Sequence, residues 1–556
     1  EIRLSLVGSE MCIRDSHYAE QVFKNFEIIS RCIFRVTRNA DIAIDEGLYD
    51  HDVDFRDIMS DLVKKRKKLQ PVRLEFLGKP DDSIAALIAK TLKVRDSFIF
   101  WQTAPLTMDF LSSVERKLEK NSELFFAPLT PQKSPSIDTK RPMIEQIKQH
   151  DIMLNYPYEN INQFIRLLEE AAENPDVVSI KITLYRVARD SKIISALTRA
   201  AENGKDVLAL VELRARFDEE NNIGWSKCLE DAGVTVIYGL DELKVHSKLL
   251  LITLRDGNDV SYITQVGTGN YNERTSKLYT DLTLMTADRD FGSDASVVFN
   301  ALAVGNTVES TNKLLVAPKG LKSRIVELID NEITYKDKGY IGIKMNSLTD
   351  KDIIEKLAEA SRAGVKIELV VRGICCLIAG VEGDTENIRV ISIVGRFLEH
   401  SRIYIFGTGD RRRVYISSAD FMTRNTERRV EVAAPLLDKS IADRAVEIFE
   451  TMLRDNVKAR EQDSDGNYYH VQPKEGEPRL NSQIYFYEQA YKAAEQAQHE
   501  EEEREQNLRE RKAPKAEELA QAAAALGAPY TVPTAPNGYS QSAKPIHQVK
   551  IRRIRK

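Results

Sequence analysis

The strongest constraint on the fold is an internal duplication between residues 190 and 372. A helical pattern of apolar residues occurs twice with one constant spacing, first as Ile193, Ile194 and Leu197 and then as Ile353, Ile354 and Leu357. Gly204 and Gly364 directly follow these stretches, where a C-terminal cap glycine belongs. Similarity at a fixed spacing indicates repeated structural units. The sequence therefore predicts two similar domains rather than one continuous core.

Each copy has the pattern strand, helix, strand. In the first copy, Val178–Leu184 and Val207–Val211 flank the helical stretch, and Ile341–Met345 and Ile367–Val371 flank it in the second. Strands that alternate with helices predict a sheet of parallel strands that helices cover. The expected fold class is therefore α/β, with two duplicated domains.

Each copy then leads to a histidine motif, which reads His246-Ser-Lys248 in the first copy and His400-Ser-Arg402 in the second. Both motifs lie at the start of apolar, strand-like runs, and small-residue turns follow at 267–270 and 417–420. Two such copies can bring two imidazoles into one pocket, one as nucleophile and one as acid/base. That arrangement suits phosphoryl transfer.

Two carboxylates occupy matching positions after these turns. Asp281 lies 11 residues after Asn270, and Glu431 lies 11 residues after Asp420. An imidazole that attacks through one ring nitrogen needs an acceptor at the other to fix its tautomer. From the repeat we expect Asp281 to orient His246 and Glu431 to orient His400.

Cationic side chains cluster near the ends of the expected strands and near the histidines. They are Arg186, Arg189, Arg214, Arg216, Lys248, Arg372 and Arg402. Open α/β sheets bind ligands outside the carboxyl ends of their strands, and arginine and lysine stabilise the charge of a transferring phosphoryl group. One such arginine alone is more often part of a surface ion pair, but the set around two histidines predicts an anion site.

Charge and composition limit the other possibilities. The net charge of −5 gives no general attraction to nucleic acid or another polyanion, so an anion site has to be local. The five cysteines fit a reducing compartment. Neither a CxxC spacing nor an HExxH motif is present, so the sequence gives no sign of a zinc site. No apolar run reaches 18 residues, which predicts no transmembrane helix.

Shifts in composition suggest five segments. Residues 1–16 differ in style from the rest of the chain and are interpreted as a non-native or artefactual leader, and 17–132 form a partial head domain of mixed α+β type. Residues 133–313 and 314–495 are the two expected catalytic domains. Residues 496–556 form a charged, low-complexity tail, which we expect to be disordered because it offers little apolar surface for burial.

Taken together, these motifs resemble those of type-1 polyphosphate kinases. The matching stretches are 182–188, 212–219, 244–248, 267–273, 278–281, 371–373, 398–400 and 418–425. The two histidine halves are also similar to the phospholipase D superfamily, whose site is built from paired HxK repeats. The resemblance implies two phospholipase D-like domains and reversible transfer of the ATP γ-phosphate to inorganic polyphosphate, with Mg²⁺.

The resemblance also implies individual roles. His246 would become the phosphohistidine, and His400 would act as the acid/base. The positions that match ATP contacts in the family are Tyr279, Arg372 and His400. Arg186 and Arg216 match positions described as Mg²⁺-binding, but a guanidinium has no lone pair for a metal. We therefore expect both to contact phosphate oxygens beside an ion that phosphates and water hold.

The sequence departs from the family at its N-terminus. Family members carry a helical domain before the region that starts here near His17, with an Asn that contacts the nucleotide, so the chain looks truncated. We expect a cytoplasmic protein, or one peripheral to the inner membrane, that forms a homo-oligomer, binds ATP, ADP and polyphosphate, and binds no nucleic acid.

Two alternatives stay open. The first is a phosphodiesterase or phosphatidyl transferase of the phospholipase D class, although Arg402 and Asp420 stand where that class prefers Lys and Asn. The second is an inactive fragment that only binds polyphosphate.

Overall fold

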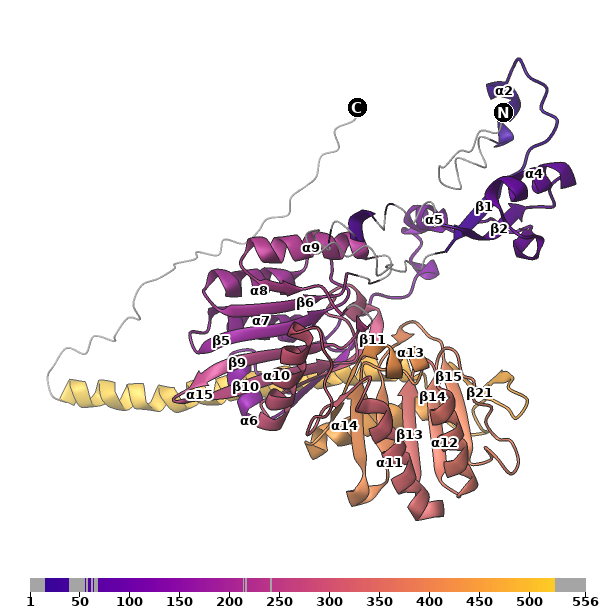
Figure 1. Ribbon diagram of the computed structural model, residues 1–556. Helices are drawn as coiled ribbons and strands as arrows, with labels where there is room; N and C mark the ends of the chain where they lie inside the picture. Colours follow the sequence, from indigo (N-terminus) through magenta and orange to yellow (C-terminus); the bar gives the residue numbers. More distant parts are fainter. Residues whose placement is uncertain are drawn as a thin grey trace. The chain divides into compact units, whose positions relative to one another are not determined.

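The computed structural model describes residues 16–39, 56, 59–61, 64, 69–213, 215, 218–240 and 243–525. The chain divides into two units, Glu1–Lys492 and Ala493–Lys556. The first unit holds a head region and two α/β halves (Figure 1). The expected leader lies outside the described residues except for Ser16, and so does the tail beyond Ala525.

The head region has the mixed α+β composition that the sequence predicts. Its three-stranded sheet has the order β1-β2-β3, with β2 antiparallel to β1 and parallel to β3. Helix α4 packs Ile88 and Ala89 against Leu74 and Phe76 of the central strand. The elements of this region are α2 (Ala19–Val22), β1 (Phe34–Arg38), β2 (Pro71–Leu77), α4 (Asp82–Leu92), β3 (Ile99–Gln102) and α5 (Leu111–Leu118).

The first half is built on one mixed sheet with the strand order β4-β11-β10-β9-β5-β6-β7. Its strands are β4 (Ile152–Tyr156), β5 (Val177–Leu184), β6 (Asp206–Val211), β7 (Thr235–Ile237), β9 (Leu249–Asp256), β10 (Asp259–Gly267) and β11 (Tyr279–Thr286). Its helices are α6 (Met143–Gln149), α7 (Asn162–Glu173), α8 (Lys192–Glu202), α9 (Glu219–Asp231) and α10 (Arg289–Ala303).

The second half repeats this order strand by strand as β12-β20-β18-β17-β13-β14-β15, and β21 and β22 extend its edge. Its strands are β12 (Leu315–Val316), β13 (Tyr340–Met345), β14 (Lys366–Val371), β15 (Ile388–Ile393), β17 (Ile403–Phe406), β18 (Arg413–Ser417), β20 (Val432–Pro435), β21 (Ala459–Gln462) and β22 (Tyr468–His470). Its helices are α11 (Leu321–Tyr335), α12 (Lys351–Arg362), α13 (Thr423–Glu427) and α14 (Lys439–Leu453). The duplication expected from the sequence is therefore confirmed.

The copies agree even in how their helices begin. Asp288 caps α10 by accepting the N–H groups of Asp290 and Phe291 at 2.9 and 3.1 Å. Asp438 caps α14 in the same way, at 2.8 and 3.1 Å. Such caps satisfy backbone donors that the first turn leaves without an intrahelical acceptor. Equivalent capping residues therefore start equivalent helices.

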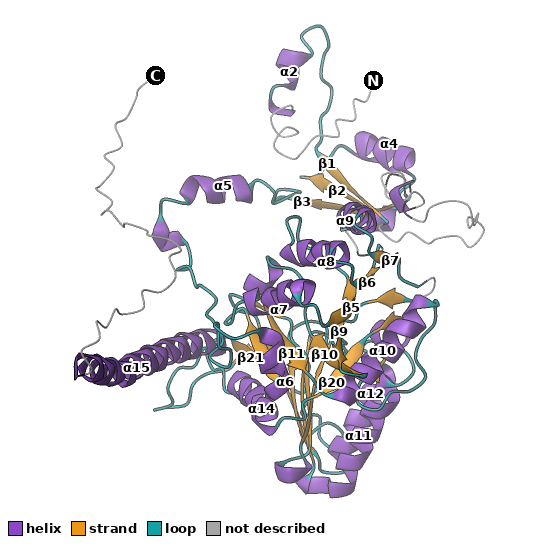
Figure 2. Ribbon diagram, turned by 90° about the vertical axis from the view of Figure 1, so that its left-hand side faces the viewer, coloured by secondary structure: helices purple, strands orange, loops and turns teal. Residues whose placement is uncertain are grey.

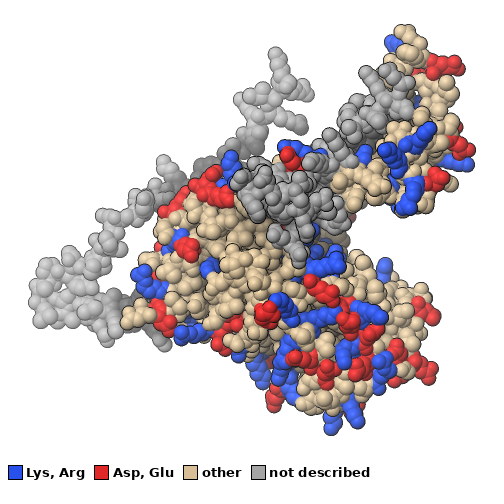
Figure 3. All heavy atoms as spheres, in the orientation of Figure 1, with Lys and Arg blue, Asp and Glu red and all other residues tan. Residues whose placement is uncertain are grey.

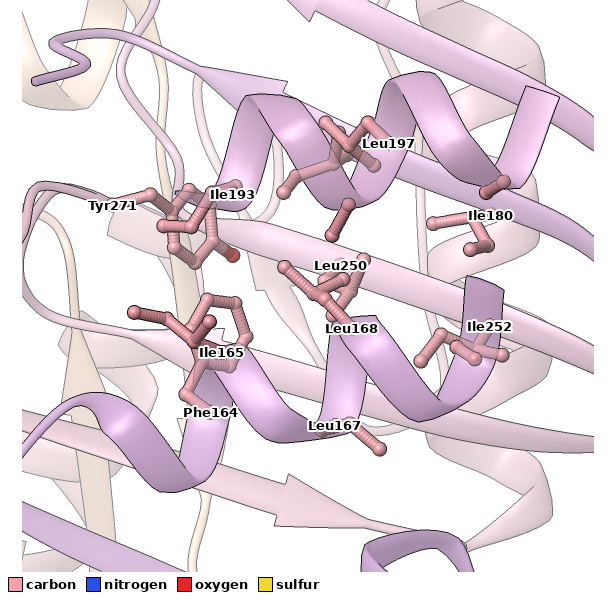
Figure 4. Packing of buried hydrophobic residues seen from close by; sticks show 14 of the residues in the cluster. Phe164, Ile165, Leu167, Leu168, Ile180, Ile193, Leu197, Leu250, Ile252 and Tyr271 are labelled. Carbon is pink, nitrogen blue, oxygen red and sulfur yellow. The ribbon is translucent and has the colours of Figure 1, made fainter. Parts of the chain in front are cut away.

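Apolar cores stabilise each half and join the two halves to each other. In the first half, α7 and α8 cover one face of the sheet through residues such as Leu168 and Leu197, and Phe164 stacks on Tyr271 at 5.2 Å (Figure 4). Helices α11 and α12 cover the second sheet in the same way. A third core contains residues of both sheets, among them Leu251 and Ile405, together with α10 and α14. Helices flank the strands on both sides in the view of Figure 2.

Two short strands cross from one half to the other. Strand β8 (Lys244–Val245) pairs in parallel with β19 (Arg429–Val430) of the second half. Strand β16 (Leu398–Glu399) of the second half pairs in parallel with the start of β11. Each of these strands immediately precedes a motif histidine, so the exchange places each histidine beside the other half.

The last described helix, α15 (Ser482–Ala525), is longer than expected. The sequence predicts a charged, low-complexity tail without regular structure from residue 496 onward. The helix instead continues to Ala525, because this segment is rich in alanine, the strongest helix former. Within the described part of the chain, no helix is both long and apolar enough to span a membrane.

Candidate active site

Backbone hydrogen bonds across the two halves fix the positions of both histidines. The N–H of His246 donates to the carbonyl of Val430 at 2.9 Å, and the N–H of His400 donates to Thr280 Oγ1 at 3.1 Å. Val430 and Thr280 directly precede Glu431 and Asp281. Each histidine therefore lies beside a carboxylate of the other half.

The expected assignment of the carboxylates is wrong in its pairing. His246 Nδ1 lies 2.9 Å from both oxygens of Glu431, and His400 Nδ1 lies 2.8 and 3.0 Å from those of Asp281. The repeat identifies the four residues but pairs each histidine with the carboxylate of its own half. The pairs are crossed because β8 and β16 each join a strand of the opposite half.

Glu431 is fully buried and ionised. Its oxygens also accept hydrogen bonds from Ser418 Oγ at 2.5 Å and Asn425 Nδ2 at 2.6 Å. Burial opposes ionisation, but contact with His246 and the charge of Lys248 prevail and lower the pKa of Glu431 to about 2. The carboxylate is therefore a fixed acceptor for the imidazole.

His246 is a neutral imidazole with one defined tautomer. Burial outweighs the attraction of Glu431 and lowers the pKa of His246 to about 3. With Glu431 ionised, the Nδ1–H donates to it, and the lone pair is on Nε2. The ring of Tyr185 lies edge-on to the imidazole, with 4.9 Å between the ring centroids and an angle of 84°. This is the protonation state that a nucleophile needs.

His400 has a similar environment. Burial lowers its pKa, although Asp281 acts in the opposite direction. Burial also disfavours ionised Asp281, but its contacts with His400 and Thr268 lower the pKa of Asp281 overall. Thr268 Oγ1 donates to Asp281 Oδ1 at 2.6 Å, and the ring of Tyr279 lies 5.4 Å from the imidazole.

The basic residues of the two motifs differ in how their charges are balanced. Nε and Nη2 of Arg402 lie 3.2 Å from the two oxygens of Asp420, and Nη1 lies 3.4 and 3.3 Å from the two ring nitrogens of His400. Lys248 donates to the carbonyl of His246, and among the described residues it forms no ion pair with a carboxylate. Asn270 stands where the other half has Asp420.

One turn connects the two motifs. The N–H of Gly267 in this turn donates to the carbonyl of Lys248 at 2.9 Å. The carbonyl of the following residue, Thr268, accepts from Arg402 Nη1 at 3.2 Å. Arg402 in turn donates to the carbonyl of His400 at 2.7 Å. The two histidine motifs therefore belong to a single site.

Two further predicted arginines border this site. Arg372 Nε donates to Asn346 Oδ1 at 2.7 Å, and the N–H of Asn346 donates to Asp420 at 2.8 Å. The guanidinium of Arg186 lies 5.7 Å from the ring centre of Tyr185, which contacts His246. Arg214 and Arg216 lie outside the described residues.

Several residues of the site have no role in the expectations from sequence. Ser418 and Asn425 hold Glu431, and Lys344 and Glu399 form a buried ion pair behind His400. Lys344 could have been noticed in the sequence, because it is a charged residue within the apolar run 341–345. Ser418 and Asn425 fall within a stretch that resembles the family, but their contact with Glu431 is visible only in three dimensions.

Sequence comparisons identify the family of this chain. The family descriptions that match are "Polyphosphate kinase middle domain" at residues 10–114, "Polyphosphate kinase C-terminal domain 1" at 142–308 and "Polyphosphate kinase C-terminal domain 2" at 314–483. A polyphosphate kinase of Bacillus anthracis is 44% identical over 485 residues, which cover 86% of this chain and 68% of that protein. The chain belongs to the polyphosphate kinase family.

Other relatives agree with this membership. The polyphosphate kinase of Halalkalibacterium halodurans is 44% identical over 483 residues, which cover 85% of this chain and 68% of that protein. The crystal structure of polyphosphate kinase from Porphyromonas gingivalis matches with a TM-score of 0.71 and 33% identity, over 87% of this chain and 70% of that chain. The chain thus spans about two thirds of the length of these polyphosphate kinases, and it is a phosphotransferase by class.

The described side chains do not form a metal site of their own. No group of three or more His, Cys, Asp or Glu residues in the described part of the chain could hold a metal ion. Arg186 offers only donors, and its Nε lies 2.8 Å from Asp218 Oδ2. The side chains that the structure describes therefore do not fit an Mg²⁺ ion held by protein ligands, and no catalytic step is assigned to such an ion.

Proposed function

We propose that this chain transfers the γ-phosphoryl group of ATP to inorganic polyphosphate, reversibly, through a phosphohistidine at His246. The observation that carries the proposal is the buried pair of His246 and Glu431, which leaves a neutral imidazole with Nε2 available for attack. Two steps through a covalent intermediate let donor and acceptor use one site in turn.

In the first step, His246 Nε2 attacks the γ-phosphorus. The N–P bond forms, the bond from phosphorus to the bridging oxygen breaks, and ADP leaves with the electron pair. The imidazole becomes positively charged, and Glu431 stabilises that charge through the Nδ1–H. In the second step, a terminal oxygen of polyphosphate takes the phosphoryl group and the N–P bond breaks. Donor and acceptor are both phosphoanhydrides, so the same steps run in either direction.

The difference between the motifs supports His246, rather than His400, as the nucleophile. The charge of Arg402 is balanced by Asp420, whereas Lys248 has no such partner among the described residues. A transferring phosphoryl group carries negative charge that a nearby cation stabilises. Lys248 belongs to the motif of His246, so the unbalanced cation is on that side of the site.

His400 has the complementary role of acid/base. Its Nδ1 faces Asp281, so its Nε2 can accept or donate a proton at the leaving and entering oxygens. Arg372 and Tyr279, beside His400, and Arg186, beside Tyr185, are proposed to contact the phosphates and the nucleotide. Mg²⁺ would be held by phosphate oxygens of the substrates and by water, and Arg186 and Arg216 are proposed to contact those phosphates.

Surface charge supports a local anion site. On the face of the molecule that Figure 3 shows, basic and acidic side chains of the second half alternate. Many of these charges pair with one another, as Lys322 does with Asp352 at 2.7 Å and Lys356 with Glu359 at 2.8 Å. The described charges of the second half on this face are therefore interspersed and partly paired.

Intact-mass analysis after exposure to ATP tests the proposal. We expect one added phosphoryl group, which peptide mapping places on the peptide that contains His246. Release of choline or a nucleotide without labelling of the protein would instead support the phospholipase D class. Binding of polyphosphate without labelling or ATP/ADP exchange would support an inactive fragment.

The pH dependence tests the role of Lys248. Burial lowers the pKa of Lys248 to about 7, so kcat/KM for ATP is expected to fall as pH rises above that value and the amine loses its charge. His246, with a pKa of about 3, stays unprotonated on mild acidification, so no loss is expected near the ordinary histidine pKa of about 6.5. Lys248→Arg keeps its charge and should remove the alkaline fall. If kcat/KM for ATP still fell at alkaline pH in this variant, the fall could not be due to loss of charge on Lys248.

A further inference from the structure

A buried polar network connects the start of α15 with His400. Lys344 and Glu399 are 1% and 4% exposed, and Lys344 Nζ lies 3.2 Å from Glu399 Oε2. The same oxygen accepts from Thr280 Oγ1 at 2.9 Å. The other oxygen, Oε1, accepts from Nε2 of Gln483 at 2.6 Å, and Gln483 is itself 1% exposed. Both oxygens of Glu399 are therefore occupied by donors from different elements.

The amide of Gln483 also holds the backbone that leads to His400. Its Oε1 accepts the N–H of Phe397 and its Nε2 donates to the carbonyl of Phe397, both at 3.0 Å. A side chain at Gly395 would overlap the same amide. Strand β16 itself pairs with β11 over only two residues, so few backbone bonds hold it in register. The amide of Gln483 thus holds Phe397, the residue directly before this short strand, through two further hydrogen bonds.

The first turn of α15 is well placed for this task because other contacts hold it. The backbone N–H of Ser482 donates to Asp455 Oδ2 at 2.8 Å, and the hydroxyl of Tyr487 donates to the carbonyl of Leu129 at 2.7 Å. The ring of Tyr487 stacks on Phe397 at 5.7 Å. The amide of Gln483 therefore approaches β16 from a fixed position.

The two halves differ at this point. In the first half, Thr183 Oγ1 donates to the carbonyl of Ser247 at 2.8 Å. In the second half, Lys344 Nζ donates to the equivalent carbonyl, that of Ser401, at 2.9 Å. A hydroxyl is thus sufficient for that hydrogen bond. A buried ion pair is weak evidence for added stability, so its presence only behind His400 points to a role in geometry.

We propose that Gln483 and the Lys344–Glu399 pair form a positioning network that keeps His400 aligned with Asp281. Thr280 transmits the alignment, because it donates to Glu399, accepts the N–H of His400 at 3.1 Å, and directly precedes Asp281. Without the network, β16 shifts along β11 and the imidazole moves away from its carboxylate. The effect on catalysis rests on the role of His400 proposed above, whereas the effect on the ring geometry does not.

The test uses Gln483→Ala in the full chain, with Ser482→Ala as the matched control. Ser482 is the neighbouring buried residue of α15, and it contacts Asp455 but not β16. NMR of ¹⁵N-histidine-labelled protein reports the Nδ1–H of His400, identified by its loss in His400→Gln. We expect this signal to shift or broaden in Gln483→Ala and to stay unchanged in Ser482→Ala. An unchanged signal in Gln483→Ala would overturn the proposal.

Kinetics separates this proposal from the proposed function. Discharge of the phosphoenzyme to polyphosphate is expected to slow by about ten- to a hundredfold in Gln483→Ala, the effect of a small misplacement of a reacting group. A shifted NMR signal with an unchanged discharge rate would support the positioning network and contradict the acid/base role of His400. A slower discharge with an unchanged signal would contradict the network.

A charge exchange provides a rescue that a general loss of stability would not show. Glu399→Gln combined with Gln483→Glu again places one carboxylate and one amide between Lys344 and Phe397. Relative to the unaltered protein, the discharge rate of the double variant is expected to exceed the product of the relative rates of the two single variants. Strictly multiplicative effects would contradict direct coupling between the two side chains.

Discussion

His246→Ala is expected to abolish phosphoenzyme formation and to lower ATP-dependent polyphosphate synthesis by at least about 10⁴-fold. The variant removes the atom that bonds to phosphorus, and the neighbouring His400 is not expected to replace it because Asp420 balances the charge of Arg402 on that side of the site. Incubation with γ-labelled ATP and quantification of the labelled protein measure the effect. The label on the unaltered protein should be acid-labile and stable to base.

A cysteine variant is the appropriate control for that experiment. Cys375→Ser alters a thiol in the second half that contacts the carbonyl of Leu377, away from the histidine motifs in sequence. It should retain the label. A base-stable, acid-labile phosphoryl group that persists in His246→Ala would show that another residue is the nucleophile.

Glu431→Gln is expected to lower the rate of phosphoenzyme formation by about 10³- to 10⁴-fold, as removal of the charge behind a catalytic imidazole does. The amide has nearly the same shape, but it cannot accept from His246, Ser418 and Asn425 together. The tautomer of the imidazole is then no longer fixed, and no carboxylate stabilises the positive charge that develops on the ring. Rapid-quench measurement of the labelled protein gives the rate.

The matched variant is Asp281→Asn. The crossed pairs predict that it acts on His400 and leaves the tautomer of His246 in place, so phosphoenzyme formation falls much less than in Glu431→Gln. If Asp281→Asn instead blocked labelling and Glu431→Gln did not, the crossed arrangement would be wrong. The two variants therefore test the assignment of the carboxylates directly.

Local patterns were sufficient to predict the central strands β5, β6, β13 and β14 and the helices α8 and α12 between them. The runs at 178–184 and 341–345 form β5 and β13, because β-branched residues in short apolar runs favour strands wherever the run lies in the chain. The recurrence of these runs also predicts the duplicated architecture. The site residues His246, His400, Asp281 and Glu431 could be identified for the same reason.

The partners of these residues could not be predicted from the repeat. Strands β8 and β16 have two residues each, too few for a recognisable pattern, and they pair with strands far away in sequence. The position of Gln483 beside Phe397 likewise depends on how α15 packs against the second half. Local propensity contains no information on such contacts, which result from the packing of complete domains.

The crossing of β8 and β16 has a mechanical consequence. Each imidazole and its acceptor carboxylate belong to different halves, so both hydrogen-bonded pairs depend on how the two halves pack together. In the proposed mechanism, the nucleophile and the acid/base therefore share one structural requirement, which is the packing of the two halves.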